Sequence, residues 1–102
     1  MTAYRLTAEA DEDMVAVFIQ GCDLFGLRQA SRYLDDLEAL FPRIAANPEM
    51  TRLRLEFDPP LRAFGYKAHV VIYDVDDEGV RILRIRHSHE DWHSDPAGHD
   101  TP

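Results

Sequence analysis

The stretch Val80–Trp92, VRILRIRHSHEDW, decides the fold because it joins an apolar strand to the densest group of ionisable side chains in the chain. It follows the turn Asp76–Gly79, which is typical of the second strand of a β-hairpin. Side chains of an extended strand alternate between two faces. The predicted packing face holds Leu83, Ile85 and His87, and the predicted partner face holds Ile82, Arg84 and Arg86.

Upstream of this hairpin, a short strand precedes two helical patterns. Residues 3–6 are predicted to form the strand, and Thr7 is predicted to cap a helix whose first turns are acidic. Gly26 ends that helix, and a second one runs over residues 27–46, so the two form an antiparallel hairpin. The predicted apolar stripes are Val15, Phe18, Ile19, Cys22 and Phe25 in the first helix, and Ala30, Tyr33, Leu34, Leu37, Leu40, Phe41 and Ile44 in the second.

The remaining segments complete an α+β fold. Residues 49–60 are predicted to be a connector with a short strand at 54–57, followed by strands at 61–66, 67–75 and 80–86. The predicted architecture is therefore an N-terminal strand, an antiparallel helix hairpin and a three-stranded antiparallel sheet that carries the hairpin on one face. Residues 1–92 are expected to form one domain. Residues 93–102, which lack apolar periodicity, are expected to be a disordered tail.

Composition excludes several classes of protein. The chain has 102 residues, no apolar run long enough to span a membrane and no signal-peptide pattern, so a cytoplasmic location is expected. Cys22 is the only cysteine, which excludes an internal disulfide and a cysteine-based zinc site. The net charge of −8 argues against a generic nucleic-acid-binding surface. Four histidines near the C-terminus suggest a zinc site: His87, His89, His93 and His99. A flexible tail rarely fixes the tetrahedral geometry that zinc requires, so no metal or cofactor is expected.

The residues from position 60 onward carry a family resemblance. The pattern runs Leu61-Arg62-x-Phe64-x-Tyr66-x-x-His69-Val70-Val71-Ile72-Tyr73, then Val75-Asp76-Asp77-x-Gly79-Val80-x-Ile82-Leu83-Arg84-Ile85-x-His87 and Asp91-Trp92. It resembles the C-terminal signature of ParE-type toxins in the RelE/ParE superfamily of bacterial toxin-antitoxin modules. The resemblance implies a growth-inhibiting toxin that binds DNA gyrase without catalysing a reaction. It also implies a ParD-like, DNA-binding antitoxin that wraps the toxin. Asp74, His89 and Glu90 depart from the basic residues that relatives often carry.

The resemblance and the strand pattern together name candidate site residues. Target binding is expected at Arg84, Arg86, His87, His89 and Trp92, and antitoxin binding at Phe57, Arg62, Phe64, Tyr66 and Tyr73. The complex with antitoxin is expected to be hetero-oligomeric and to reach operator DNA through the antitoxin. Each side chain also has a structural alternative: a hydrogen-bonded His87, a Trp92 that closes the core, and arginines paired with carboxylates.

Two other functions remain open. RelE-type and YoeB-type relatives cut messenger RNA on the ribosome, and His87 with Arg84 and Arg86 would supply part of that chemistry. No tyrosine follows His87, which favours an inhibitor that acts by binding. A plain acidic domain with one protein partner is the third possibility. Surplus apolar residues predict a partner groove: Phe25, Leu27, Phe41, Leu53, Leu55, Phe57, Phe64 and Tyr66.

Overall fold

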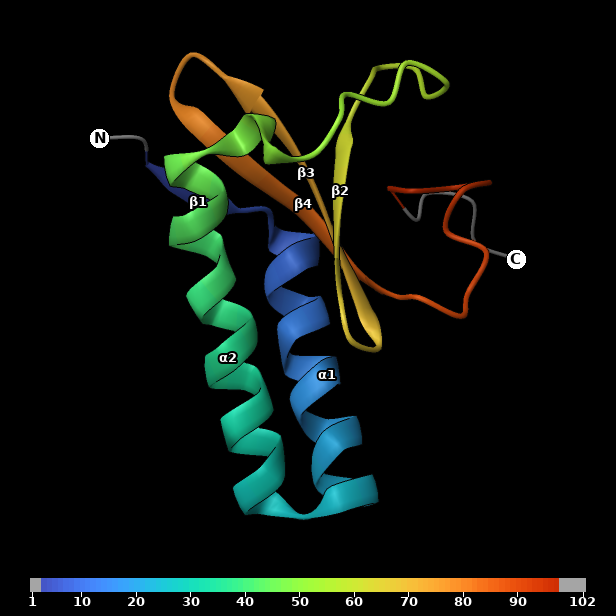
Figure 1. Ribbon diagram of the computed structural model, residues 1–102. Helices are drawn as coiled ribbons and strands as arrows, with labels where there is room; N and C mark the ends of the chain where they lie inside the picture. The colour runs from blue at the N-terminus through green and yellow to red at the C-terminus, as the bar shows by residue number, and fades with distance from the viewer. Residues whose placement is uncertain (1–2, 98–102) are drawn as a thin grey trace.

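The fold is α+β, as predicted, with two helices packed on one face of a four-stranded sheet (Figure 1). A computed structural model describes residues 3–97. In chain order the elements are β1 (Tyr4–Leu6), α1 (Ala8–Phe25), α2 (Leu27–Ala46), a 3₁₀ turn η1 (Pro48–Met50), β2 (Arg62–Tyr66), β3 (His69–Asp76) and β4 (Gly79–His87). Within this part of the chain no helix is both long enough and apolar enough to cross a membrane.

The sheet has one more strand than the three predicted from the sequence. Its order is β1-β4-β3-β2, with β1 parallel to β4 and the other pairs antiparallel. The amide of Val80 donates to the carbonyl of Ala3 (2.9 Å), and the amide of Thr7 donates to that of Ile82 (3.0 Å). The N-terminal strand therefore completes the edge of the sheet beside β4 before the chain enters α1.

Both predicted ends of α1 are confirmed. The Thr7 side chain accepts a hydrogen bond from the amide of Ala10 (3.1 Å), which satisfies one of the unpaired donors of the first turn. Its hydroxyl also donates to the carbonyl of Leu83 (2.7 Å), so the cap fixes the start of α1 against β4. Gly26, at φ 88°, links the helices with a backbone conformation that favours glycine.

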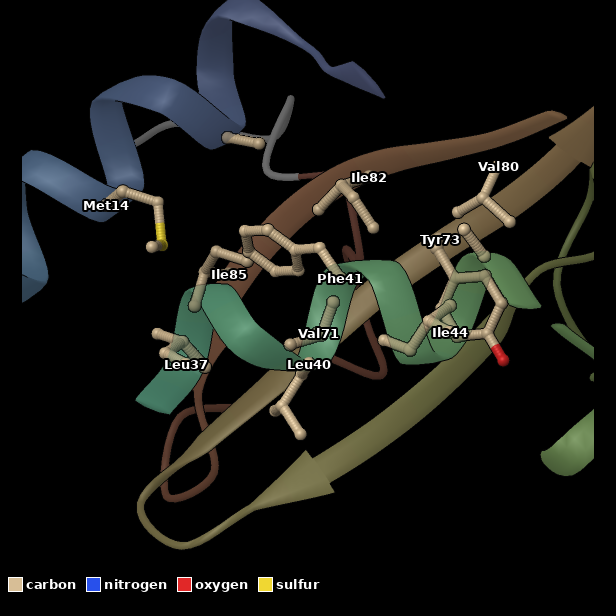
Figure 2. Close-up of a cluster of buried hydrophobic side chains, with 12 residues drawn as sticks. Met14, Leu37, Leu40, Phe41, Ile44, Val71, Tyr73, Val80, Ile82 and Ile85 are labelled. Atoms are coloured by element: carbon tan, nitrogen blue, oxygen red, sulfur yellow. The ribbon is translucent and has the colours of Figure 1, made fainter. Parts of the chain in front are cut away.

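The core between helices and sheet confirms the α2 stripe and corrects the α1 stripe (Figure 2). Leu37, Phe41 and Ile44 are almost fully buried, whereas α1 buries Ala10 and Met14. Val15 and Ile19, both in the predicted stripe, are 58% and 56% exposed. The predicted apolar positions of α1 therefore lie largely outside the core, and Ala10 and Met14 face the core instead.

The predicted alternation along β4 is wrong because the strand contains a β-bulge. Tyr73 pairs with Ile82 and Ile72 pairs with Arg84, which leaves Leu83 as the extra residue. Ile82 and Ile85 consequently share the helix-facing core, while Leu83 packs with the cluster on the opposite face. One inserted residue has exchanged the faces of Ile82 and Leu83 relative to strict alternation.

A second, smaller core covers the other face of the sheet. It contains Leu61, Ala63, Val70, Ile72 and Trp92. The strand predicted at residues 54–57 is replaced by a single bridge between Arg54 and Leu61. Within the segment for which a disordered tail is predicted, the carbonyls of Asp95 and Ala97 accept hydrogen bonds from Arg86 and Arg84. The rest of that prediction falls on residues 98–102, outside the described residues.

Candidate functional site

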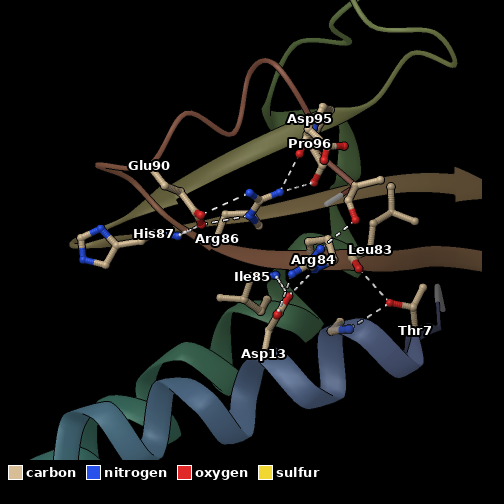
Figure 3. Close-up of polar contacts among 12 residues, drawn as sticks. Thr7, Asp13, Leu83, Arg84, Ile85, Arg86, His87, Glu90, Asp95 and Pro96 are labelled. Atoms are coloured by element: carbon tan, nitrogen blue, oxygen red, sulfur yellow. Dashed lines mark hydrogen bonds and ion pairs between the residues drawn. The ribbon is translucent and has the colours of Figure 1, made fainter. Parts of the chain in front are cut away.

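The first predicted target-binding arginine is engaged inside the fold. Arg84 of β4 donates to both carboxylate oxygens of Asp13 on α1, at 2.6 and 2.9 Å (Figure 3). Asp13 also accepts from the amide of Ile85 (2.9 Å), and Arg84 donates to the carbonyl of Ala97 (2.7 Å). The hydrogen bond to Asp13, more than any other effect, raises the pKa of Arg84. This side chain therefore joins α1, β4 and the C-terminal segment.

Arg86 has a similar set of internal partners. It donates to both carboxylate oxygens of Glu90 (2.9 and 3.2 Å) and to the carbonyls of Asp95 and Pro96 (2.7 and 3.2 Å; Figure 3). The hydrogen bond from Arg86 lowers the pKa of Glu90. Only 12% of the Arg86 side chain is exposed, and 20% of Arg84. A partner would meet two cations that are already neutralised and covered.

His87 belongs to a cluster of rings that sequence reasoning did not bring together. Its ring centroid lies 5.3 Å from that of His69 on β3 and 5.1 Å from that of His89. The Tyr33 hydroxyl lies 2.7 Å from Nδ1 of His69. Burial first, and the proximity of His87 second, lower the pKa of His69, so its neutral form is favoured. The cluster holds three imidazoles and a phenol at one end of the sheet.

Trp92 is part of the second core. It is 6% exposed, and its ring stacks on Phe57 at 6.2 Å and on His93 at 3.9 Å between centroids. The guanidinium of Arg54 lies 5.3 Å from the Trp92 ring. This placement agrees with the structural alternative given for Trp92 from the sequence, in which the ring closes the core. Its ring is not presented to a target in this conformation.

The residues predicted to bind antitoxin occupy two faces of the molecule. Phe64 and Tyr66 pack against the core below the helices, whereas Phe57 packs on the opposite side of the sheet. Tyr73 is fully buried, and its hydroxyl lies 2.8 Å from the Thr51 hydroxyl and donates to the Pro48 carbonyl. Arg62 donates to the carbonyl of Thr51. Tyr73 is therefore packed under the connector, which Arg62 also holds, and antitoxin binding at these two residues stays a prediction.

Exposed apolar side chains, most of them in the predicted surplus, gather on the helix hairpin and the connector. Leu24, Phe25 and Leu27 are 64%, 62% and 66% exposed at its far end, which projects past the sheet (Figure 1). On the connector, Leu53 and Leu55 are 43% and 73% exposed. Of the predicted surplus apolar residues, Phe41 is instead buried in the core. Residues 3–97 contain no group of three histidine, cysteine or acidic side chains placed to hold a metal ion.

Comparison of the fold places it beside toxin-antitoxin proteins. A chain from a solved structure titled "Chromosomal ParDE TA system from P. aeruginosa" matches with a TM-score of 0.75 and 19% sequence identity. The match covers 85% of this chain and 96% of that chain. At this level of identity the likeness shows a shared α+β fold.

Sequence comparison then defines the family. The family model described as ParE toxin of type II toxin-antitoxin system, parDE, matches residues 4–92. Toxin ParE3 of Caulobacter vibrioides is 37% identical over 79 residues, covering 78% of this chain and 79% of the relative. Toxin ParE1 of Mycobacterium tuberculosis is 30% identical over 89 residues, covering 86% and 91%. The chain belongs to the ParE toxin family of the RelE/ParE superfamily.

Proposed function

We propose that the protein is the growth-inhibiting component of a two-gene module and is neutralised by a ParD-like antitoxin. The observation that carries this proposal is the family match over residues 4–92 together with relatives named Toxin ParE. DNA gyrase in the cytoplasm is the proposed target, and operator DNA is reached through the antitoxin. The exposed apolar side chains of the hairpin and connector support a protein partner, because patches of this kind mark interaction surfaces.

Regulated expression in a bacterial host tests the toxin and its target. Expression alone should arrest growth with filamentous cells and double-strand breaks, and co-expression of the small protein encoded beside it should restore growth. Purified toxin should inhibit DNA supercoiling by gyrase. Growth arrest with active gyrase and intact DNA would remove gyrase as the target, and normal growth on expression alone would remove toxicity itself.

A ribosome-dependent endonuclease is the second candidate, because the fold supplies the hydroxyl that the C-terminal sequence lacks. Tyr33 and His69 stand beside His87 in one cluster, where a phenol and an imidazole are suited to proton transfer. His87→Ala should reduce such a cleavage rate by about 10²- to 10⁴-fold, but should have little effect on an inhibitor that acts by binding. Growth arrest and messenger RNA cleavage, measured for wild type and His87→Ala, separate the two mechanisms.

A further inference from the structure

The structure divides the basic side chains into those neutralised within the chain and those that are not. Arg5, Arg52, Arg81, Arg84 and Arg86 each pair with a carboxylate. Arg28, Arg32 and Lys67 have no carboxylate partner within residues 3–97, and the three line one surface pocket of about 430 Å³. Arg43, Arg54 and Arg62 also lack a carboxylate partner among these residues, but they do not line this pocket. Three unpaired cations therefore converge at the hairpin, away from the arginines of β4.

This pocket continues into a second one with an apolar lining. The neighbouring cavity, of about 360 Å³, shares Phe25, Gln29, Tyr33 and Lys67 with the first. Val17, Leu24 and Ala30 line its apolar part, and His69 and His87 line the side formed by the sheet. The two pockets together form a cleft, here called the hairpin cleft, with cations at one end and apolar side chains along its wall.

Lys67 occupies its position in the cleft despite an unfavourable backbone conformation. Its φ is 52°, in the left-handed region where glycine or asparagine is preferred, at the turn between β2 and β3. Its ammonium lies 5.4 Å from the centre of the Tyr66 ring. A two-residue turn between antiparallel strands commonly takes a positive φ at its first position, so the turn holds the lysine charge beside the cleft.

We propose that the hairpin cleft binds an acidic amphipathic segment of a partner protein. Arg28 and Arg32 lie one helical turn apart, so they match two carboxylates one turn apart on a partner helix. Lys67 supplies a third cation, and the exposed ring of Phe25 with Leu24 receives apolar side chains. This proposal depends on the proposed function in one respect, which is that the partner is a protein.

A protein segment fits this cleft better than a nucleic acid. Asp36 lines the same pocket as the two arginines, and the whole chain carries a net charge of −8. Both repel a polyanion with one negative charge per phosphate, whereas a segment with two or three carboxylates matches the local cations. The apolar wall adds contacts that phosphate and sugar do not use.

Binding of a defined peptide to the purified full chain tests the proposal. The probe is a fluorescent peptide of about 14 residues with leucines on one helical face and glutamates flanking them at three- and four-residue steps. Fluorescence anisotropy at low salt should show saturable binding, and the glutamine version of the peptide should bind roughly 10-fold more weakly. Arg28→Glu combined with Arg32→Glu should give a similar loss. Arg43→Glu, an exposed arginine of α2 that does not line the cleft, is the matched control.

Lys67→Asn separates binding from folding, because asparagine tolerates the left-handed conformation. This variant should melt at the same or a higher temperature than wild type and yet bind the acidic peptide several-fold more weakly. No binding of the acidic peptide, or an equal loss with Arg43→Glu, would overturn the proposal. Tighter binding of a thymidine oligonucleotide than of the peptide would replace a protein partner with a nucleic acid. Peptide binding is measured without reference to toxicity. If a non-toxic chain still binds the peptide, the proposed toxin function is rejected and the proposed hairpin cleft is not.

Discussion

At the residue scale, Asp13 is the side chain whose loss the fold should tolerate least among the acids of α1. It pairs with Arg84 and accepts the amide of Ile85, and the Arg84 and Asp13 side chains are only 20% and 15% exposed. Asp13→Ala leaves a covered guanidinium without its carboxylate, so it should lower the free energy of unfolding by about 2 to 4 kcal/mol. Urea unfolding measures this, with exposed Asp35→Ala as a control expected within about 0.5 kcal/mol of wild type. Equal effects of the two changes would contradict this role of Asp13.

His69 should make stability depend on pH. Burial and the neighbouring His87 lower its pKa below the ordinary value of 6.5, so the unfolded chain binds more protons than the folded chain in that window. The stability that depends on neutral His69 is fully present when the pH is above the unfolded pKa of about 6.5. It is lost as the pH falls below that value toward the lowered pKa of the folded chain. Thermal melting between about pH 7 and 5 should therefore show a smaller drop for His69→Gln than for wild type. Parallel curves for the two proteins would reject this assignment.

At the scale of the element, the exposed face of α1 should tolerate truncation that the buried positions of α2 and β3 do not. Ile19→Ala should change the free energy of unfolding by less than about 0.5 kcal/mol, because the side chain is 56% exposed. Leu37→Ala in α2 and Ile72→Ala in β3, each fully buried, should cost about 2 to 5 kcal/mol by opening a cavity. Chemical denaturation of the three variants measures the difference. A large cost at Ile19 would mean that the apolar stripe predicted from the sequence faces the core after all.

The same elements show how far sequence reasoning reaches. The caps, the α2 stripe and the β3–β4 hairpin were predictable because local chemistry determines them: Thr7 caps α1 and Gly26 ends it. The buried face of α1 was not, because Ala10 and Met14 lie in the core while the more strongly apolar Val15 and Ile19 stay outside. The bulge at Leu83 depends on pairing between strands and leaves no local signal. The pairing of Arg84 with Asp13 joins positions 71 residues apart, which no spacing rule reaches.

At the scale of the whole molecule, the sheet is covered on both faces by segments of different kinds. Helices cover one face, and the connector with the C-terminal segment covers the other (Figure 1). The arginines of β4 hold this second layer through the carbonyls of Asp95, Pro96 and Ala97. Truncation experiments on the C-terminal region therefore change the architecture of the sheet as well as any target contact.

Two C-terminal truncations, one ending at Arg86 and one ending at Trp92, should therefore differ in stability. A chain that ends at Arg86 loses Trp92 from the second core, where the ring is 6% exposed and stacks on Phe57. Loss of such a side chain costs about 3 to 5 kcal/mol, a large part of the roughly 5 to 15 kcal/mol that stabilises a small domain. A chain that ends at Trp92 keeps the ring. It loses the His93 ring that stacks on Trp92, and it loses the carbonyl partners of Arg84 and Arg86, which water replaces at roughly 1 kcal/mol.

Thermal melting and soluble yield of both chains, each with and without antitoxin, measure this difference. The chain ending at Trp92 should melt within a few degrees of the full chain and still bind antitoxin, and the chain ending at Arg86 should be largely insoluble. Loss of killing by the shorter chain alone would then report a lost core. Loss of killing by the chain ending at Trp92, with antitoxin binding intact, would instead place a target contact in residues 93–102. Equal stability of the two chains would show that Trp92 does not hold the second core together.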